Sequence, residues 1–344
     1  MNSLETNCYN APFSHVYVER GVLSHPRTGR ILKQLRPKAV IEIDHYKDVF
    51  CRAKQNHGLQ NQIPMLILAE KQDHRIYPGA PVCQDFDEKH FFYTSCVMNC
   101  MYDCAYCYLK GMYPSGNLVI FVNLEETFRE VRSRLAGNAD DGEGLYLCIS
   151  YDTDLLALEN LTGFVREWAV LAKELPQLRV ECRTKCARTD LWSTLPLAKN
   201  LIVAFTLSPQ AVIECCEHRT PSLEDRIRSA RAAMDAGFSV RLCFDPMIYV
   251  PEWKACYAEM IEKVKHRIAM ERLRDVSVGS FRISKDYLKR LRKGQPDSAV
   301  VQFPFALDAG VYHYPDGLMN EMEEYLVGQL RECMPAERIF RWKS

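Results

Sequence analysis

The sequence has no excess of charge of either sign and no long apolar run. Lys plus Arg and Asp plus Glu each number 44 among 344 residues, so the formal net charge is zero. This balance excludes a protein drawn to nucleic acid by its overall charge, and leaves local basic clusters for such contact. The chain lacks the run of about 18 apolar residues that a membrane-spanning helix needs, and its polar opening, MNSLET, is unlike a signal peptide. We therefore expect a cytoplasmic protein with no attachment to membranes.

Internal repeats and low-complexity segments are also absent from the sequence. With 47% hydrophobic residues the chain can bury a large core, and we expect one large globular domain with appendages. Cysteine is abundant, with 15 residues, but the number is odd and the chain is not a short secreted scaffold. We therefore expect no disulfide framework, and a reducing compartment.

Three cysteines, Cys100, Cys104 and Cys107, lie within eight residues. Thiolates at this spacing can hold three irons of a 4Fe–4S cluster and leave the fourth iron open for another ligand. A structural zinc site is instead closed by four ligands, usually from two C-x2-C pairs, and only one such pair is present here. Cys96 would have to supply the fourth ligand of a closed zinc site or electron-transfer cluster, and that interpretation remains the alternative.

The middle of the chain alternates between strand-like and helix-like patterns. Strand-like runs occupy residues 91–95, 118–123, 145–150, 178–183, 200–207, 238–244 and 276–283, and amphipathic helical runs occupy 124–135, 159–175, 222–236 and 252–268. The third helical run ends at Gly237, the residue type that a left-handed C-cap favours. This alternation predicts right-handed crossovers and a mainly parallel sheet. We expect an N-terminal segment over 1–88, a core over 89–300, and a tail over 301–344 that ends with a helix at 318–334.

The cysteine motif has the form C-x3-C-x2-C, with Tyr106 directly before the last cysteine. This form resembles the signature of the radical S-adenosylmethionine (SAM) superfamily, and the chain as a whole resembles the spore photoproduct lyase family. The likeness also covers residues 16–19, 92–96, 121–123, 152–154, 183–185, 205–206, 226–227 and 246–249. It implies an α/β fold, a partial (β/α)6 radical SAM barrel with an N-terminal extension, a short C-terminal tail and a site at the carboxyl ends of the strands.

The resemblance also implies a reaction. A 4Fe–4S cluster on the three cysteines, reduced by a reductase or a flavodoxin- or ferredoxin-type donor, would cleave SAM to a 5′-deoxyadenosyl radical. That radical takes hydrogen from the methylene bridge of the spore photoproduct, a thymine–thymine adduct in ultraviolet-damaged DNA. Lys185 and Thr206 match family positions beside SAM, where a lysine would pair with the methionyl carboxylate. Tyr106 and Tyr108 match tyrosines tied to SAM packing and to hydrogen return.

Two features depart from the family pattern. Tyr151 stands where the family has a cysteine hydrogen donor. If residues 145, 147, 149 and 151 face inward, strand alternation turns Cys148 to the opposite face. The donor is therefore open between Tyr151, a relay with Tyr106, and Cys148 if the strand bends.

The second departure lies in the region of the family's DNA-entering hairpin, which here, over 302–310, has no basic residue. The nearest positive cluster comprises Arg282, Lys285, Lys289, Arg290, Arg292 and Lys293. We expect residues 285, 289 and 292 to share a helical face suited to DNA phosphates.

Three functions are therefore compatible with the sequence. The first is a DNA-repair lyase acting on the spore photoproduct, and the second is a radical SAM enzyme of the same family with a different substrate. The third is a non-catalytic iron–sulfur or zinc protein that senses redox state or binds nucleic acid. We expect a monomer or weak dimer, and the first function is our prediction.

Overall fold

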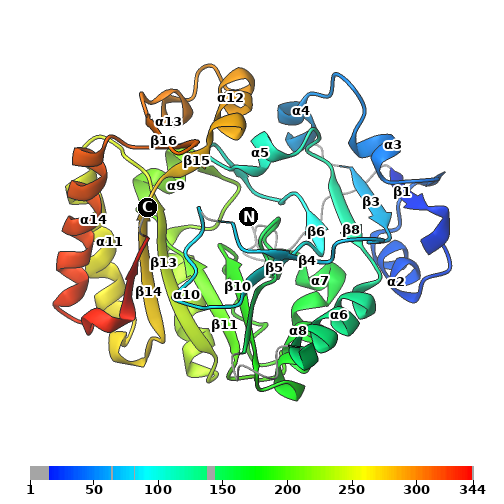
Figure 1. Ribbon diagram of the computed structural model, residues 1–344, viewed down its shortest axis with the longest axis horizontal. Coiled ribbons are helices and arrows are strands. Elements are labelled where there is room, and N and C mark those ends of the chain that lie inside the picture. The colour runs from blue at the N-terminus through cyan, green and yellow to red at the C-terminus, as the bar shows by residue number, and fades with distance from the viewer. Residues whose placement is uncertain (1–14, 63–64, 81, 138–143, 343–344) are drawn as a thin grey trace.

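A computed structural model (Figure 1) describes residues 15–62, 65–80, 82–137 and 144–342. Its large sheet has eight strands in the order β18-β14-β13-β11-β10-β9-β5-β4. Their bounds are Ile76–Pro78 for β4, Phe91–Thr94 for β5, Leu145–Cys148 for β9, Leu178–Thr184 for β10, Leu201–Thr206 for β11, Ser239–Met247 for β13, Asp275–Ser280 for β14 and Ile339–Arg341 for β18. All neighbours pair in parallel except β4 and β5. The predicted α/β fold with a partial parallel barrel is confirmed.

Helices cover the outer side of this sheet (Figure 1). They are α6 (Leu124–Gly137), α7 (Glu159–Thr162), α8 (Phe164–Glu174), α10 (Leu223–Asp235), α11 (Trp253–Arg267) and α14 (Asp316–Arg331), while the short α9 (Gln210–Cys216) lies at the end of the sheet. The predicted helix at 159–175 is split, because Gly163 takes a left-handed conformation (φ 67°) that ends α7. Ser222 caps α10 by accepting from the Asp225 N–H, and Gly237 follows its end with φ 90°, as the sequence predicted.

A second, five-stranded sheet has the order β2-β1-β3-β8-β6. Its strands are His15–Glu19 (β1), Ala39–Ile43 (β2), Leu66–Ala69 (β3), Val97–Met98 (β6) and Leu118–Phe121 (β8), and α2 (Pro26–Leu35), α3 (Lys47–Phe50) and α4 (His57–Gln62) accompany it. The expectation that residues 118–123 add a barrel strand is wrong, since β8 pairs with β3 and β6. Side chains of β8 are buried on both faces, which makes its sequence look like that of a barrel strand.

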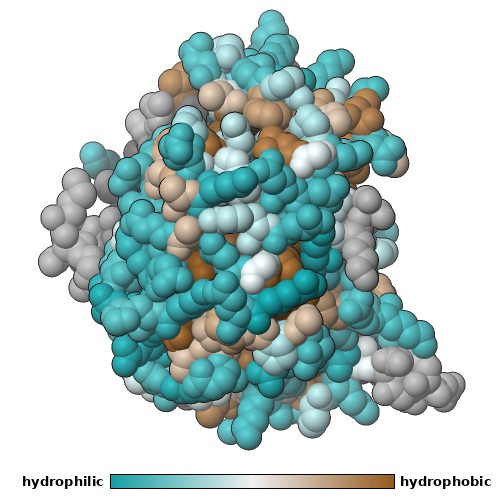
Figure 2. All heavy atoms as spheres, turned by 90° about the vertical axis from the view of Figure 1, so that its left-hand side faces the viewer, coloured by the Kyte–Doolittle hydropathy of each residue, from teal (hydrophilic) through white to brown (hydrophobic). Residues whose placement is uncertain are grey.

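The C-terminal part of the chain returns to the large sheet. A small antiparallel sheet, β15 (Arg282–Ser284), β17 (Val311–His313) and β16 (Ala306–Asp308), lies with α12 (Lys285–Gly294) and α13 (Ala299–Gln302). After it, α14 packs on α11 and β14, and β18 pairs with β14. The face over α11 and α14 is mostly hydrophilic at its surface (Figure 2). None of the helices in the described ranges is both long and apolar enough to cross a membrane.

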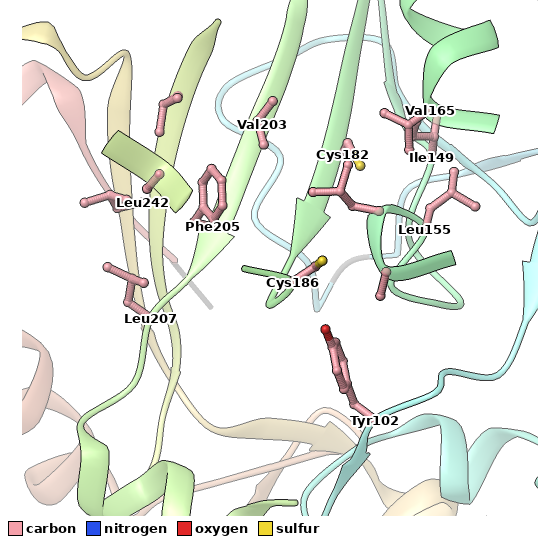
Figure 3. Packing of buried hydrophobic residues seen from close by; sticks show 14 of the residues in the cluster. Tyr102, Ile149, Leu155, Val165, Cys182, Cys186, Val203, Phe205, Leu207 and Leu242 are labelled. Atoms are coloured by element: carbon pink, nitrogen blue, oxygen red, sulfur yellow. The ribbon is translucent and has the colours of Figure 1, made fainter. Parts of the chain in front are cut away.

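The main core lies between the large sheet and its helices. In this core, Cys182 and Phe205 of the sheet lie with Val165 of α8 and other apolar side chains (Figure 3). Tyr102, from the loop that carries the cysteine motif, points into the same core beside Cys186 (Figure 3). Burial of apolar area stabilises a fold by roughly 25 cal/mol per Å², and here it anchors the cysteine loop as well as the sheet.

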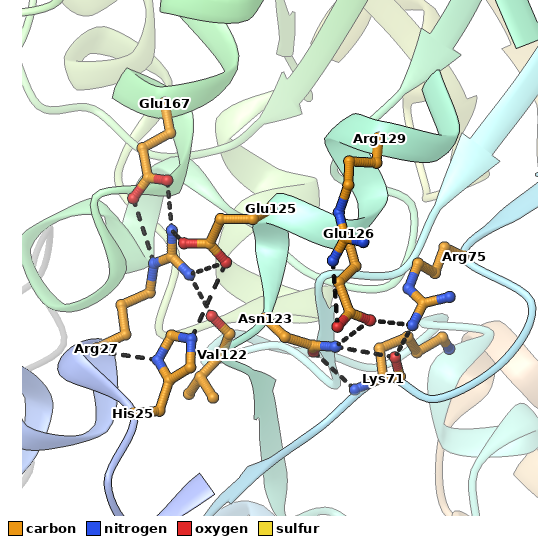
Figure 4. A network of polar contacts seen from close by, with 10 residues as sticks. All are labelled: His25, Arg27, Lys71, Arg75, Val122, Asn123, Glu125, Glu126, Arg129 and Glu167. Atoms are coloured by element: carbon orange, nitrogen blue, oxygen red, sulfur yellow. Dashed lines mark hydrogen bonds and ion pairs between the residues drawn. The ribbon is translucent and has the colours of Figure 1, made fainter. Parts of the chain in front are cut away.

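A polar network joins the second sheet to helices of the large sheet (Figure 4). The side-chain amide of Asn123 donates to the Lys71 carbonyl at 3.0 Å, and its Oδ1 accepts from the Lys71 N–H at 2.8 Å. Arg27 of α2 donates to the Val122 carbonyl and pairs with Glu167 of α8. These contacts fix the carboxyl end of β8 against the helices of the large sheet.

Candidate functional site

The cysteine loop lies at the carboxyl ends of the barrel strands and is held there by backbone pairing. The short strand β7 (Asp103–Cys104) pairs antiparallel with β12 (Glu217–His218), which follows α9. The Ala105 N–H donates to the Cys216 carbonyl at 2.7 Å. Segments that are more than 100 residues apart in the sequence therefore form one platform.

The three predicted cluster ligands lie close together on this platform. Cys104 and Cys107 line a cavity of about 270 Å³, and the Cys100 sulfur beside them accepts from the Tyr102 N–H at 3.5 Å. Burial is the main cause that raises the pKa of Cys104 to about 12, and the Cys107 charge adds to it. Cys96 packs in the apolar core and does not line the cavity.

The donor set fits an iron–sulfur cluster in residue type and in position. Three thiols on one loop, with mutual charge effects on their pKa values, can supply three soft ligands and leave one iron open. Among the described residues no three Cys, His, Asp or Glu side chains are already arranged around one metal position. A 4Fe–4S cluster takes one thiolate on each of three irons, so it does not need three side chains around one position.

The predicted site residues, with the exceptions of Cys100 and Cys148, meet in this one cavity. Its lining includes Cys104, Tyr106, Cys107, Tyr108, Tyr151, Lys185 and Thr206. The sequence interpretation missed further lining residues, among them Cys83, Arg183, Asp245, Phe281 and Tyr287. No local motif marks these residues, because they come from separate strands and loops.

Lys185 is positioned by a buried carboxylate. Asp154 accepts from the Lys185 N–H at 2.6 Å and from the Thr184 hydroxyl at 2.7 Å, which fixes the turn after β10. Burial acts to lower the pKa of Lys185, but interactions with acidic groups, of which Glu217 is the strongest, outweigh it and raise the pKa. Lys185 is therefore a cation at neutral pH, suited to an anionic ligand group such as a carboxylate.

Tyr106 is tied to a buried ion pair beneath the cavity. Its hydroxyl donates to Glu217, which also accepts from Ser208 at 2.8 Å and pairs with Arg226 at 2.5 Å. The Lys185 Nζ lies 5.8 Å from the centroid of the Tyr106 ring. The Tyr106 ring can therefore pack against a ligand, while its hydroxyl is committed to the protein.

Tyr151 lies in a column of aromatic rings. It stacks on Tyr93 with ring centroids 4.0 Å apart, and Tyr93 stacks on Tyr77 at 5.0 Å. The Tyr108 hydroxyl donates to the Tyr151 carbonyl, and the two rings are 5.6 Å apart. These contacts fix the Tyr151 ring, whose hydroxyl oxygen lies 3.7 Å from the Cys83 sulfur.

The expected orientation of β9 is wrong. Leu145, Leu147 and Ile149 belong to the core on the helix side of the sheet. Cys148 lies on the opposite face, with its sulfur 3.8 Å from Glu181 Oε1, and does not line the cavity. Regular alternation ends with the strand at Cys148, so the following turn returns Tyr151 to the cavity.

The predicted basic cluster is only partly available to a partner. Arg282 forms a pair with Asp245 at 3.0 Å, and Arg292 donates to the Val301 and Phe303 carbonyls. Residue 292 therefore does not share the expected phosphate face. The exposed cations that remain on α12 are Lys285, Lys289 and Lys293, spaced four residues apart on one face, and Arg290, which donates to the Gly111 carbonyl.

Comparison with known proteins agrees with this geometry. Residues 92–298 match a family model described as spore photoproduct lyase. A spore photoproduct lyase of Clostridium acetobutylicum is 25% identical over 249 residues, which cover 68% of this chain and 71% of that protein. A spore photoproduct lyase of Geobacillus sp. is 20% identical over 250 residues, which cover 70% of this chain and 73% of that protein.

Solved structures show the same fold. A spore photoproduct lyase complexed with dinucleoside spore photoproduct matches with a TM-score of 0.81 at 17% identity, covering 97% of this chain and 99% of that one. A mutant spore photoproduct lyase with bound AdoMet and dinucleoside spore photoproduct matches with the same values.

Proposed function

The chain belongs to the spore photoproduct lyase family, and we propose that it is a radical SAM carbon–carbon lyase that reverses the spore photoproduct in ultraviolet-damaged DNA. One observation carries this proposal. A single cavity at the carboxyl ends of the strands combines the cysteine loop, the Lys185 cation and aromatic side chains. Solved relatives with the same fold hold AdoMet and the dinucleoside lesion, which supports the same ligands here.

In this proposal Cys100, Cys104 and Cys107 hold the cluster, and the fourth iron stays open for SAM. When bound, the reduced cluster and SAM supply the organic radical that starts the reaction. Lys185 would neutralise the carboxylate of SAM, and Thr206 lines the same cavity.

The other lining residues position the ligands and keep water out. The rings of Tyr106 and Phe281 meet edge to face, with their centroids 6.1 Å apart, and form an apolar wall. Arg282 donates to the Val82 carbonyl at 2.7 Å, which holds the segment around Cys83 over the cavity. A fixed, largely apolar enclosure limits side reactions of radical intermediates.

DNA would approach along α12. Ser284 and Tyr287 line the cavity, and the free lysines of α12 continue from them along one helical face. Phosphate contacts from Lys285, Lys289 and Lys293 would add a salt-dependent, sequence-independent attraction. The hairpin of β16 and β17 presents Leu307, which is 45% exposed, so its contact with a lesioned duplex would be apolar.

A second candidate function is a radical SAM reaction of the same family on another substrate. Two observations favour it, namely Tyr151 in place of the family's cysteine and the absence of basic residues from the hairpin stretch 302–310. We propose a cytoplasmic monomer or weak dimer that takes electrons from a reductase or a flavodoxin- or ferredoxin-type protein.

Anaerobic reconstitution followed by a repair assay tests the proposal. The reconstituted protein should show 4Fe–4S absorbance, cleave SAM, and convert dinucleoside spore photoproduct to two thymidines. Cys104→Ala should lack all three properties. SAM cleavage without loss of the lesion would favour the second candidate, and a colourless protein that ignores SAM would exclude both.

A further inference from the structure

A second cavity reaches the cysteine loop at Ala105. It has a volume of about 590 Å³, and its lining residues differ from those of the cofactor cavity. The lining combines Ala105 with the end of α9, the segment that follows β13 and residues around α13. The reaction proposed above uses none of the side chains of this second cavity, so their chemistry is open to another role.

Two adjacent thiols line the second cavity. Cys215 and Cys216 are the last two residues of α9, and one thiol donates to the other at 2.6 Å. Cys215 is exposed, whereas Cys216 is buried beside it. When an exposed thiol is oxidised, a neighbouring thiol can capture it as a disulfide, which a thiol reductant reverses. The pair therefore has the chemistry of a reversible oxidation site.

The same two residues support the cysteine loop. The Cys216 carbonyl accepts from the Ala105 N–H at 2.7 Å, and the next residue, Glu217, pairs with Cys104 between β12 and β7. Gln295, which also lines the second cavity, donates from its side chain to the Ala105 carbonyl at 3.0 Å. Both backbone polar groups of Ala105 are thus bonded to residues of this cavity, and a backbone shift at Cys216 acts directly on the loop.

We propose that Cys215 and Cys216 form a redox modification site, at which a peroxide closes a disulfide and loosens the cysteine loop. This inference goes beyond the proposed function and does not depend on the substrate. The Cys215 sulfur attacks the peroxide, so the O–O bond breaks, an S–O bond forms and one water leaves. The Cys216 sulfur then displaces the oxygen from Cys215, an S–S bond forms and a second water leaves. The two sulfurs are oxidised, and the peroxide oxygens are reduced.

The loosening follows from the geometry of adjacent residues. Neighbouring Cα atoms are about 3.8 Å apart across a trans peptide. The Cα atoms of a disulfide are usually roughly 4.4–6.8 Å apart, so closing this ring requires the backbone to move. Because Cys216 ends α9, the movement falls on the carbonyl that bonds Ala105 and on the Glu217 N–H, which donates to the Ile213 carbonyl.

Peptide mass spectrometry of the cofactor-free protein tests the modification. Trypsin releases residues 200–219 as one peptide whose cysteines are Cys215 and Cys216. After brief treatment with hydrogen peroxide this peptide should lose the mass of two hydrogens, and dithiothreitol should restore it. Cys216→Ala should instead leave a sulfenic acid on Cys215 that dimedone traps. A peptide that keeps its hydrogens, or gains oxygen without losing them, would overturn the site.

Hydrogen exchange of the same protein tests the effect on the loop. Peptides that span Ala105 should exchange about two- to tenfold faster after peroxide treatment, since a typical hydrogen bond contributes about that factor. Cys215→Ser, at an exposed position, should show no such change under the same treatment, whereas Cys51→Ser, at an exposed position after α3, should behave like the wild type. A closed disulfide with unchanged exchange, or faster exchange in Cys215→Ser as well, would overturn the link to the loop. Neither experiment uses the cofactor or the lesion, so either failure leaves the proposed function intact.

Discussion

Replacing Glu217 by Gln tests whether the buried ion pair holds the cysteine loop in place. Glu217 and Arg226 are both fully buried, and Glu217 also accepts from Tyr106 and Ser208. Through β12 the same residue pairs with Cys104 on the loop. Gln keeps the shape of Glu217 but leaves the Arg226 charge without its partner.

The size of the effect follows from the charges. Although burial acts to raise it, the charges of Arg226 and Lys185 lower the pKa of Glu217 from 4.5 to about 2. This shift corresponds to about 3 kcal/mol of unfolding free energy at neutral pH, in line with the roughly 3–5 kcal/mol lost when one partner of a buried pair is removed. Because the folded pKa lies below the unfolded pKa, this stability is present above pH 4.5 and is lost as the pH falls towards 2.

Urea unfolding of the cofactor-free protein measures this difference. Glu217→Gln should lower the unfolding free energy by about 3 kcal/mol at pH 7. The difference in unfolding free energy between the variant and the wild type should become smaller as the pH falls below 4. Glu214→Gln, at an exposed position of α9 that bonds only Gln210 among the described residues, serves as the matched control. A loss below about 1 kcal/mol that does not change with pH would refute the reasoning.

Variants of the cofactor loop and of the cations near it should separate their roles. Cys104→Ala should lose iron–sulfur absorbance after anaerobic reconstitution, whereas Cys96→Ala, in the apolar core, should keep it; equal loss would contradict the three-cysteine loop. Lys185→Ala should raise the Kd for SAM roughly ten- to a hundredfold with the cluster intact, since a charge-assisted contact contributes about 1.5–3 kcal/mol. Unchanged affinity would remove Lys185 from the SAM site, and Lys173→Ala on α8 is its control. Changing Lys285, Lys289 and Lys293 together to Gln should reduce the slope of log K for DNA against log salt by about 3. An unchanged slope would show that DNA binds to another surface of the protein.

The parts of the fold that the sequence predicted are those with a local signal. Alternating strands and helices predicted the parallel sheet, and Gly237 marked the end of α10. The cysteine motif, Lys185 and Tyr151 all follow strand ends or lie on the loop above them, and parallel strands bring such positions to one edge. The structure brings them together for that reason.

The parts that the sequence could not predict depend on contacts between distant segments. The apolar run at 118–123 has no polar face, so its sequence does not indicate which of the two sheets the strand joins. The orientation of Cys148 was misassigned for the same reason, since β9 is buried on both faces. Cys83 carries no motif, and its contact with Tyr151 spans 68 residues. Arg292 looked free because its acceptors are backbone carbonyls, which a sequence does not distinguish.

The most direct measurement follows a hydrogen atom from the lesion. The reconstituted protein would be given dinucleoside spore photoproduct that carries deuterium on the carbons of both bases and of the bridge between them, and the 5′-deoxyadenosine released from SAM would be analysed by mass spectrometry. A radical SAM lyase acting on this lesion should transfer deuterium to the 5′-deoxyadenosine while it releases thymidine. Unlabelled 5′-deoxyadenosine together with an intact lesion would contradict the account.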